Sequence, residues 1–146
     1  GNGEGSFSRA CEALFTGQMH TGAGLEVYPE AVPVEVGSAF ITCLSIGPVA
    51  MANPCRIVSV LDEPLRAGFT YGTITGHVLS GEEDFAIELE AGGAVWLTIT
   101  AGARPRASYA RLGAPITVRA QSAMAKRYTQ ALQRAAGTPI SDSPHD

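Results

Sequence analysis

The stretch "YGTITGHVLSGEEDF", residues Tyr71–Phe85, predicts a strand, a turn and the start of a second strand. Side chains along a strand alternate between two faces, so Tyr71, Thr73 and His77 project from the same face. The opposite face is mostly glycine and is too bare to supply much of a core. The polar face is therefore predicted to be the interior one, where its hydroxyl and imidazole groups would meet ordered water or a ligand oxygen.

Similar segments recur along the chain, each rich in β-branched or aromatic residues and bounded by glycine, proline or acidic residues. They are residues 24–29, 38–46, 55–63, 67–78, 84–90 and 94–102. Short connections between such segments favour pairing of consecutive strands. The pattern predicts an antiparallel meander.

Two amphipathic helices are predicted on either side of this meander. Residues Ser6–Thr16 carry apolar side chains at helical spacing, and Gly17 follows as a stop. Residues Pro115–Ala136 form one long helix with proline at its start and many alanines that permit close approach of another backbone. The order of helix, meander and long helix predicts an α+β domain in which a curved antiparallel sheet wraps around the C-terminal helix. The space left between them is the natural ligand site.

The length and charge of the chain limit the classes of function. Its 146 residues fit one domain, expected over residues 1–137, with a disordered tail over residues 138–146. A formal net charge of -4 with 10 Lys plus Arg argues against nucleic acid as a partner. No apolar run reaches the roughly 18 residues of a membrane span, and no leader-like segment opens the chain. A cytoplasmic location is predicted, and a homo-oligomer is left open.

Neither a metal nor a cofactor is predicted. The chain has three cysteines without redox or zinc spacing, which are expected to be reduced and dispensable for function: Cys11, Cys43 and Cys55. The three histidines are equally scattered, and no nucleophile elbow or phosphate-binding glycine loop is present. The classes of function that remain for this chain are acid–base catalysis, catalysis by holding a substrate in a reactive shape, and binding without catalysis.

His77 and Tyr71 are the candidate catalytic residues. An imidazole titrates near neutrality, so His77 can act as a general base or hydrogen-bond donor, and the alternative is that it satisfies a turn. Tyr71 can donate to a ligand carbonyl, or it can be a buried tyrosine with a backbone partner.

Seven further residues are candidates for ligand binding: Thr73, Arg56, Glu82, Trp96, Arg104, Met124 and Tyr128. Glu82 and Glu83 point to opposite faces of a strand, so at most one can face a cavity with His77, and Glu82 is the candidate; a solvated turn is the alternative. Arg56 is either a ligand clamp or half of a structural salt bridge.

The remaining ligand-binding candidates belong to the last strand and the last helix. Trp96 reads as a core residue that could also form the wall of a cavity, and Arg104 either guards the cavity mouth or lies on the surface. Met124 and Tyr128 fall along one stripe of the long helix and would cover the cavity from that side.

The ordered motifs "GQMHTGAGLEV", "NPCRIVSVLDEP", "GFTYGTITGHVLSGEEDF" and "VWLTITAGARP" resemble a family known as domain of unknown function 1990, of the UPF0548 type. The resemblance runs from about Gly3 to Gln133. It implies a helix-grip fold, similar to the birch-pollen-allergen and START-like domains, and it implies no reaction.

The chain also departs from the family pattern. It has "VAMANPCR" where relatives often have bulky aromatic residues, "GTITGHVL" where they often have Gly-Thr-Leu-Pro-Gly-His-Pro, and Gly102 and Ala103 where Phe-Ser is usual before Arg-Pro. These smaller groups predict a larger or differently shaped cavity. Relatives tend to carry a further segment ahead of the first helix, so this chain is expected to be shorter there.

The sequence thus predicts a helix-grip protein that binds a largely apolar, polyketide-like or lipid-like molecule in a cavity with a few polar anchors. The sharper hypothesis is a cofactor-independent cyclase or isomerase that folds its substrate into a reactive shape and polarises it with His77 or Tyr71. The alternatives are a non-catalytic carrier and an interaction module whose core is filled by its own side chains.

Overall fold

The structure is a computed structural model, which describes residues 1–30, 33–74, 79–105 and 114–137. Its helices are α1 (Gly3–Phe15), α2 (Gln18–Gly22) and α4 (Ala114–Ala136). Its strands are β1 (Glu26–Tyr28), β2 (Ala39–Ile46), β3 (Val49–Glu63), β4 (Arg66–Thr73), β5 (Leu79–Leu89) and β6 (Val95–Pro105). The chain is therefore α+β, with the element order that the sequence predicts.

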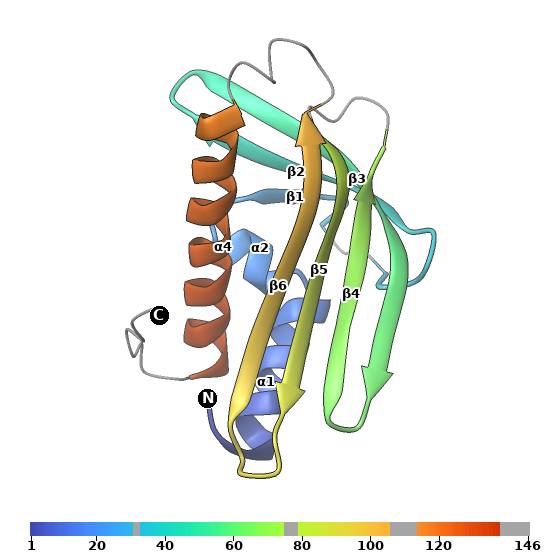
Figure 1. Cartoon of the computed structure of the whole chain (residues 1–146), viewed down its shortest axis with the longest axis vertical. Helices are drawn as coiled ribbons and strands as arrows, with labels where there is room; N and C mark the ends of the chain where they lie inside the picture. The colour runs from blue at the N-terminus through green and yellow to red at the C-terminus, as the bar shows by residue number, and fades with distance from the viewer. Residues whose placement is uncertain (31–32, 75–78, 106–113, 138–146) are drawn as a thin grey trace.

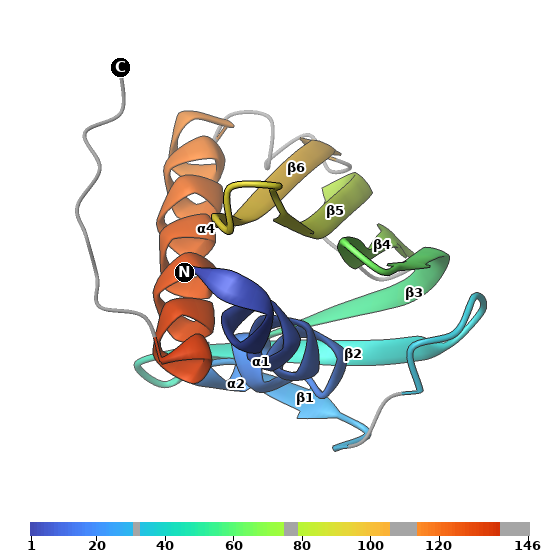
Figure 2. The ribbon, with the colours of Figure 1, turned by 90° about the horizontal axis from the view of Figure 1, so that it is seen from below.

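The strands form one six-stranded antiparallel sheet in the order β1-β2-β3-β4-β5-β6, so each strand pairs with its neighbour in sequence. The sheet is strongly curved, and the helices lie on its concave side (Figures 1 and 2). Residues that are paired directly across an antiparallel ladder point to the same face. This rule assigns the inner and outer faces used below.

Several elements differ from the sequence prediction. Strand β5 begins at Leu79, five residues before the predicted start at Asp84, and β6 runs three residues beyond the predicted end at Gly102. The third strand begins at Val49, six residues before the predicted start at Cys55, because residues 49–54 pair with β2 in a long hairpin. The short helix α2 was not predicted at all, since glycines at its borders made "GQMHTG" read as a connection. The presence of α2 matters for function, because this helix carries a buried histidine.

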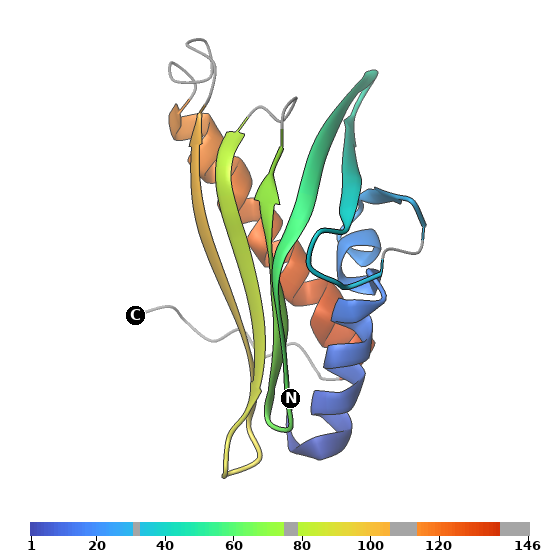
Figure 3. The ribbon, with the colours of Figure 1, turned by 90° about the vertical axis from the view of Figure 1, so that its right-hand side faces the viewer.

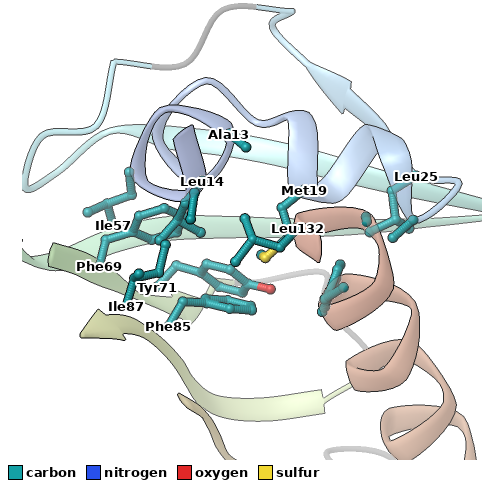
Figure 4. Close-up of a cluster of buried hydrophobic side chains, with 14 of the residues drawn as sticks. Ala13, Leu14, Met19, Leu25, Ile57, Phe69, Tyr71, Phe85, Ile87 and Leu132 are labelled. Atoms are coloured by element: carbon teal, nitrogen blue, oxygen red, sulfur yellow. The ribbon is translucent and has the colours of Figure 1, made fainter. Parts of the chain in front are cut away.

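The core lies between the inner face of the sheet and the helices (Figure 4). Its central strands β4 and β5 supply Phe69, Tyr71, Phe85 and Ile87, all of which are buried. Tyr71 lies inside, as the sequence predicts, but burial does not alternate along β4, because Gly68 and Gly72 on the other face are buried as well. Helix α1 adds Leu14 to the same cluster.

The long helix α4 packs against α1 and α2 and runs beside β6 (Figures 2 and 3). Its approach to α2 is close, because a Cβ on Gly22 would lie 3.0 Å from the Cβ of Ala131. The alanines of this helix therefore permit close approach, as predicted. The helices α1 and α2 lie between the sheet and part of α4, and the strand that α4 lies beside is β6.

No helix in the described ranges combines the length and the apolar character that a membrane span requires.

Candidate functional site

A tyrosine and a glutamate form the polar centre of the interior. Tyr71 on β4 and Glu83 on β5 are direct partners in the β4–β5 ladder, so both side chains point to the inner face. The Tyr71 side chain is buried, and its hydroxyl donates a hydrogen bond of 2.5 Å to Oε2 of Glu83. Figure 4 shows this hydroxyl among apolar side chains. The prediction that the Tyr71 side chain points into the interior is confirmed.

Burial controls the proton affinity of this centre. It raises the pKa of Glu83 above its ordinary value, because the charged carboxylate loses its hydration, while the hydrogen bond from Tyr71 acts in the opposite direction. Burial also raises the pKa of Tyr71, with smaller contributions from Tyr128 and Glu83. Burial therefore favours the protonated forms of both groups, and the Tyr71 hydroxyl is the donor of the hydrogen bond between them.

Tyr128 brings the long helix to the same centre. Its side chain is buried on α4, where the sequence predicted a covering stripe. Burial is the main cause of its raised pKa, the charge of Glu83 raises it further, and a hydrogen bond with Tyr71 lowers it. Met124, one turn earlier, is partly buried against the core. Strands β4 and β5 and helix α4 thus each contribute one oxygen-bearing side chain to the centre.

The centre is surrounded by aromatic rings. Phe40 lies edge-on to Tyr71 with ring centroids 5.2 Å apart, and Phe85 lies 5.6 Å from it. Phe85 also meets Tyr128 at 5.5 Å in an edge-on arrangement. Such contacts stabilise the core and fix the tyrosine rings, so their hydroxyls have a defined direction.

His20 is a buried titratable residue that the sequence analysis missed. It lies on α2, with its ring 5.1 Å from that of Tyr128 and 6.1 Å from that of Tyr71. Its Nε2 atom has no hydrogen-bond partner in the described part of the chain. Burial lowers the pKa of His20 to about 4, so the imidazole is neutral at pH 7. The spacing of the three histidines in the sequence does not distinguish His20 from the other two. Its burial follows from the position of α2 in the fold.

A small pocket reaches this aromatic cluster from the α1–α2 turn. Its volume is about 40 Å³. It is lined by Leu14, Phe15, Thr16, Gly17, His20, Val27, Glu30, Val34, Phe40, Ile57 and Phe69. The lining is mostly apolar and includes neither Tyr71 nor Met124. Neither this pocket nor the hollow on the outer face described below is lined by Tyr71, Trp96 or Met124.

Three predicted binding residues lie on the outer face of the sheet instead. Glu82 is exposed there, because its neighbour Glu83 takes the inward position. Trp96 is 56% exposed, on the face opposite Leu97, so the expectation that it forms a core or cavity wall is wrong. Arg56 is exposed, and it makes no ion pair with any described residue, so neither the clamp nor the salt bridge is found for it.

The outer face has a shallow hollow of about 350 Å³. Its lining is Thr70, Gly81, Glu82, Asp84, Thr100 and Gly102. Within it, the Thr70 hydroxyl donates to Oδ1 of Asp84 at 2.6 Å. The hollow is separated from Tyr71 and Glu83 by the sheet itself.

The remaining predicted site residues are only partly described. Thr73 is half-buried at the end of β4, and its hydroxyl oxygen accepts a hydrogen bond from the Gly81 amide at 3.1 Å, which ties β4 to β5. His77 lies outside the described residues. Arg104 belongs to β6, but its side chain lies outside the described part.

The three cysteines are free thiols. Cys55 is buried on the inner face, and burial raises its pKa to about 12, so it stays protonated and unreactive. In the described ranges, no three His, Cys, Asp or Glu side chains gather closely enough to hold a metal ion.

Comparison with known proteins identifies relatives. The chain is 38% identical over 149 aligned positions to a UPF0548 protein of Deinococcus radiodurans, covering 94% of this chain and 74% of that protein. It is 32% identical over 138 positions to a UPF0548 protein of Arabidopsis thaliana, covering 90% of this chain and 67% of that protein. No solved structure matches the chain. A family model described as Domain of unknown function (DUF1990) matches residues 1–131. The chain therefore belongs to the DUF1990 family, as its motifs predicted.

Proposed function

We propose that this protein binds a small, largely apolar molecule in the interior between the sheet and the helices, and holds a polar oxygen of that molecule at Tyr71, Glu83 and Tyr128. The observation that carries the proposal is the hydrogen bond that the buried Tyr71 side chain donates to the partly buried carboxyl group of Glu83. A buried carboxyl group is destabilising unless it is fully partnered, and hydrophobic residues would fill the same space at lower cost. Buried groups with shifted pKa values in a fold interior are typical of functional sites.

The sharper form of the proposal is a cofactor-independent isomerase or cyclase. The Tyr71 hydroxyl, which donates to Glu83, can instead donate to a developing oxyanion, and the Glu83 carboxylate can accept the proton of an acidic C–H group. Tyr128 extends the chain of hydroxyl groups toward α4. The apolar rings around the centre exclude water and strengthen these interactions. Neutral His20 adds a further polar group beside them.

The helix-grip arrangement belongs to this proposal. A curved antiparallel sheet with helices on its concave side supports it, because such a fold places a ligand between sheet and helices. A cytoplasmic location stays a prediction from the sequence, and the oligomeric state stays open.

The test is a thermal-shift screen of apolar ketones, enones and phenols, followed by affinity measurements on variants. We expect binding to weaken about 10- to 100-fold in Tyr71→Phe and in Glu83→Gln, because each removes one member of the polar centre. Trp96→Ala is the matched control, because Trp96 lies on the outer face, and it should retain full affinity. Unchanged affinity in both inner variants, or a screen without any binder, would contradict the proposal.

A second candidate function is an interaction module with a filled core. The small volume of the described pocket favours it, together with exposed Trp96 and the hollow on the outer face. This candidate predicts the reverse pattern, in which Trp96→Ala changes binding to a partner and Tyr71→Phe does not.

A further inference from the structure

The carboxyl group of Glu83 is the member of the polar centre that a ligand can reach most directly. The side chains of Tyr71 and Tyr128 keep only 6% and 4% of their surface exposed, whereas Glu83 is partly buried. The ladder partner of Glu83 on β6 is Ala101, which shares the inner face and is exposed. The inner face is therefore open to solvent on the β6 side of this carboxyl group.

The two oxygen atoms of this carboxyl group differ in their partners. Oε2 accepts the hydrogen bond from the Tyr71 hydroxyl. Among the described residues, Nε2 of His20 is the only buried side-chain nitrogen or oxygen without a hydrogen-bond partner. Oε1 of Glu83 also has no partner in that part of the chain, so it is not buried and keeps surface that solvent can reach. Oε1 is therefore the atom available to a ligand.

The direction of the hydrogen bond decides what kind of group can bind at Oε1. The Tyr71 hydroxyl has a single proton, and this proton is used in its hydrogen bond to Glu83. An ionised carboxyl group has no proton of its own and only accepts hydrogen bonds. Oε1 therefore needs a donor, and neither a carbonyl nor an ether oxygen can be one.

We propose that the ligand carries a hydroxyl group, as an alcohol, a phenol or an enol, which donates a hydrogen bond to Oε1 of Glu83 from the β6 side. This inference rests on the proposed function, because it names the chemical class of the ligand oxygen that the polar centre holds. A hydrogen bond to a charged acceptor is stronger than one between neutral groups. A ketone or ether of the same shape would place its lone pairs against the carboxylate and would be rejected.

The experiment compares 1-naphthol with 1-methoxynaphthalene, which keeps the ring system and the oxygen but has no proton to donate. Fluorescence titrations are carried out at a pH at which Glu83 is ionised and 1-naphthol is neutral. We expect the unaltered protein to bind 1-naphthol about tenfold or more tightly than the ether. Glu83→Met keeps an unbranched side chain and removes both oxygens, so the two affinities should become similar.

A second variant tests the direction of approach. Ala101→Leu adds bulk beside Glu83 at an exposed position, where the fold has room for a larger side chain. We expect it to weaken the binding of 1-naphthol about tenfold or more, because it occupies the open side of the carboxyl group. Thr98→Leu is the matched control, because Thr98 is exposed on the outer face of the same strand, and it should retain full affinity.

The possible results separate this inference from the proposed function. Equal affinities of the unaltered protein for the two compounds, with both weakened by Ala101→Leu, would overturn the inference alone. An unchanged preference for 1-naphthol in Glu83→Met, or full affinity in Ala101→Leu, would also overturn it. Binding of neither compound would count against the proposed function, and the inference would fall with it. The unaltered protein and Ala101→Leu decide the matter even if Glu83→Met does not fold.

Discussion

His20 couples the stability of the protein to pH. Its pKa is lowered by burial from 6.5 to about 4. Between these two values the unfolded chain binds a proton at this histidine and the folded chain does not, so stability is lost as the pH falls from 6.5 toward 4. Once the pH has fallen below about 4, the free energy of unfolding is lower by about 3 kcal/mol because of this histidine. The neighbouring Tyr71 and Tyr128 do not titrate there, because their pKa values are raised.

Urea unfolding as a function of pH measures this effect. In His20→Phe the dependence between pH 6.5 and 4 should become flatter than in the unaltered chain, because the titrating group is removed while the ring contacts are kept. Glu83 contributes the opposite slope in both proteins, since its raised pKa makes ionisation destabilising as the pH rises. An identical pH dependence in the two proteins would show that His20 is accessible to protons in the folded state.

Sequence reasoning found some of the polar centre and missed the rest. Strand alternation correctly placed Tyr71 inside, because that rule depends only on the backbone. The same rule showed that only one of Glu82 and Glu83 can point inward, and the sequence analysis chose Glu82. In the structure Glu83 is the inward residue, because it is the one that pairs with Tyr71. Register depends on how the turn is made, which single residues do not reveal. His20 gave no periodic signal, since its helix has only five residues.

Strand β4 leaves no room for a side chain at Gly68 beside β5. A Cβ at this position would lie 1.9 Å from the carbonyl oxygen of Phe85 and 3.0 Å from the Cα of Ala86. Both atoms belong to the backbone of the neighbouring strand, so they cannot move without breaking the ladder that holds Tyr71 opposite Glu83. Glycine at this position is therefore a steric requirement.

Gly68→Ala tests this requirement, with Gly72→Ala as the matched control on the same strand. A Cβ at Gly72 meets its nearest neighbour, a methyl group of Val58, at an ordinary 3.5 Å. We expect Gly68→Ala to lower the free energy of unfolding by about 2 to 4 kcal/mol and Gly72→Ala to change it by less than about 1 kcal/mol. Equal midpoints of urea unfolding for the two variants would show that the strands are not as close as described.

The strands and long helices could be predicted because they are long and periodic, whereas their ends could not. Residues 49–54 contain little β-branched character and a proline, yet they pair with β2, since a hairpin partner is already in place. Strand pairing depends on two segments, so the strand propensity of one segment alone does not predict it. The same limit hid α2, which is stabilised by packing against α4.

In the whole molecule, the interior is shared among the sheet, two short helices and the long helix. The sequence predicted the sheet, the first short helix and the long helix, missed α2, and suggested an open space between the sheet and the long helix. The close approach of Gly22 to Ala131 shows why that space is smaller than expected, since α2 fits directly beneath α4. The fold class was thus accessible from the sequence, but the shape of the interior was not. Cavity volume depends on how three packed layers meet, and no local pattern encodes it.

The central claim is that the interior holds a carboxyl group, that of Glu83, whose pKa is raised. This group accepts a hydrogen bond from Tyr71 and can form a hydrogen bond with an oxygen atom of a bound ligand. The most direct test is a pH titration of the Glu83 side-chain carboxyl by ¹³C NMR. We predict a pKa above 4.5, because burial raises it. We predict a further rise in Tyr71→Phe, since the hydrogen bond that lowers it is removed. A compound found in the screen should change the value when it binds. A Glu83 that titrates at its ordinary value, in both proteins and with or without that compound, would contradict the account.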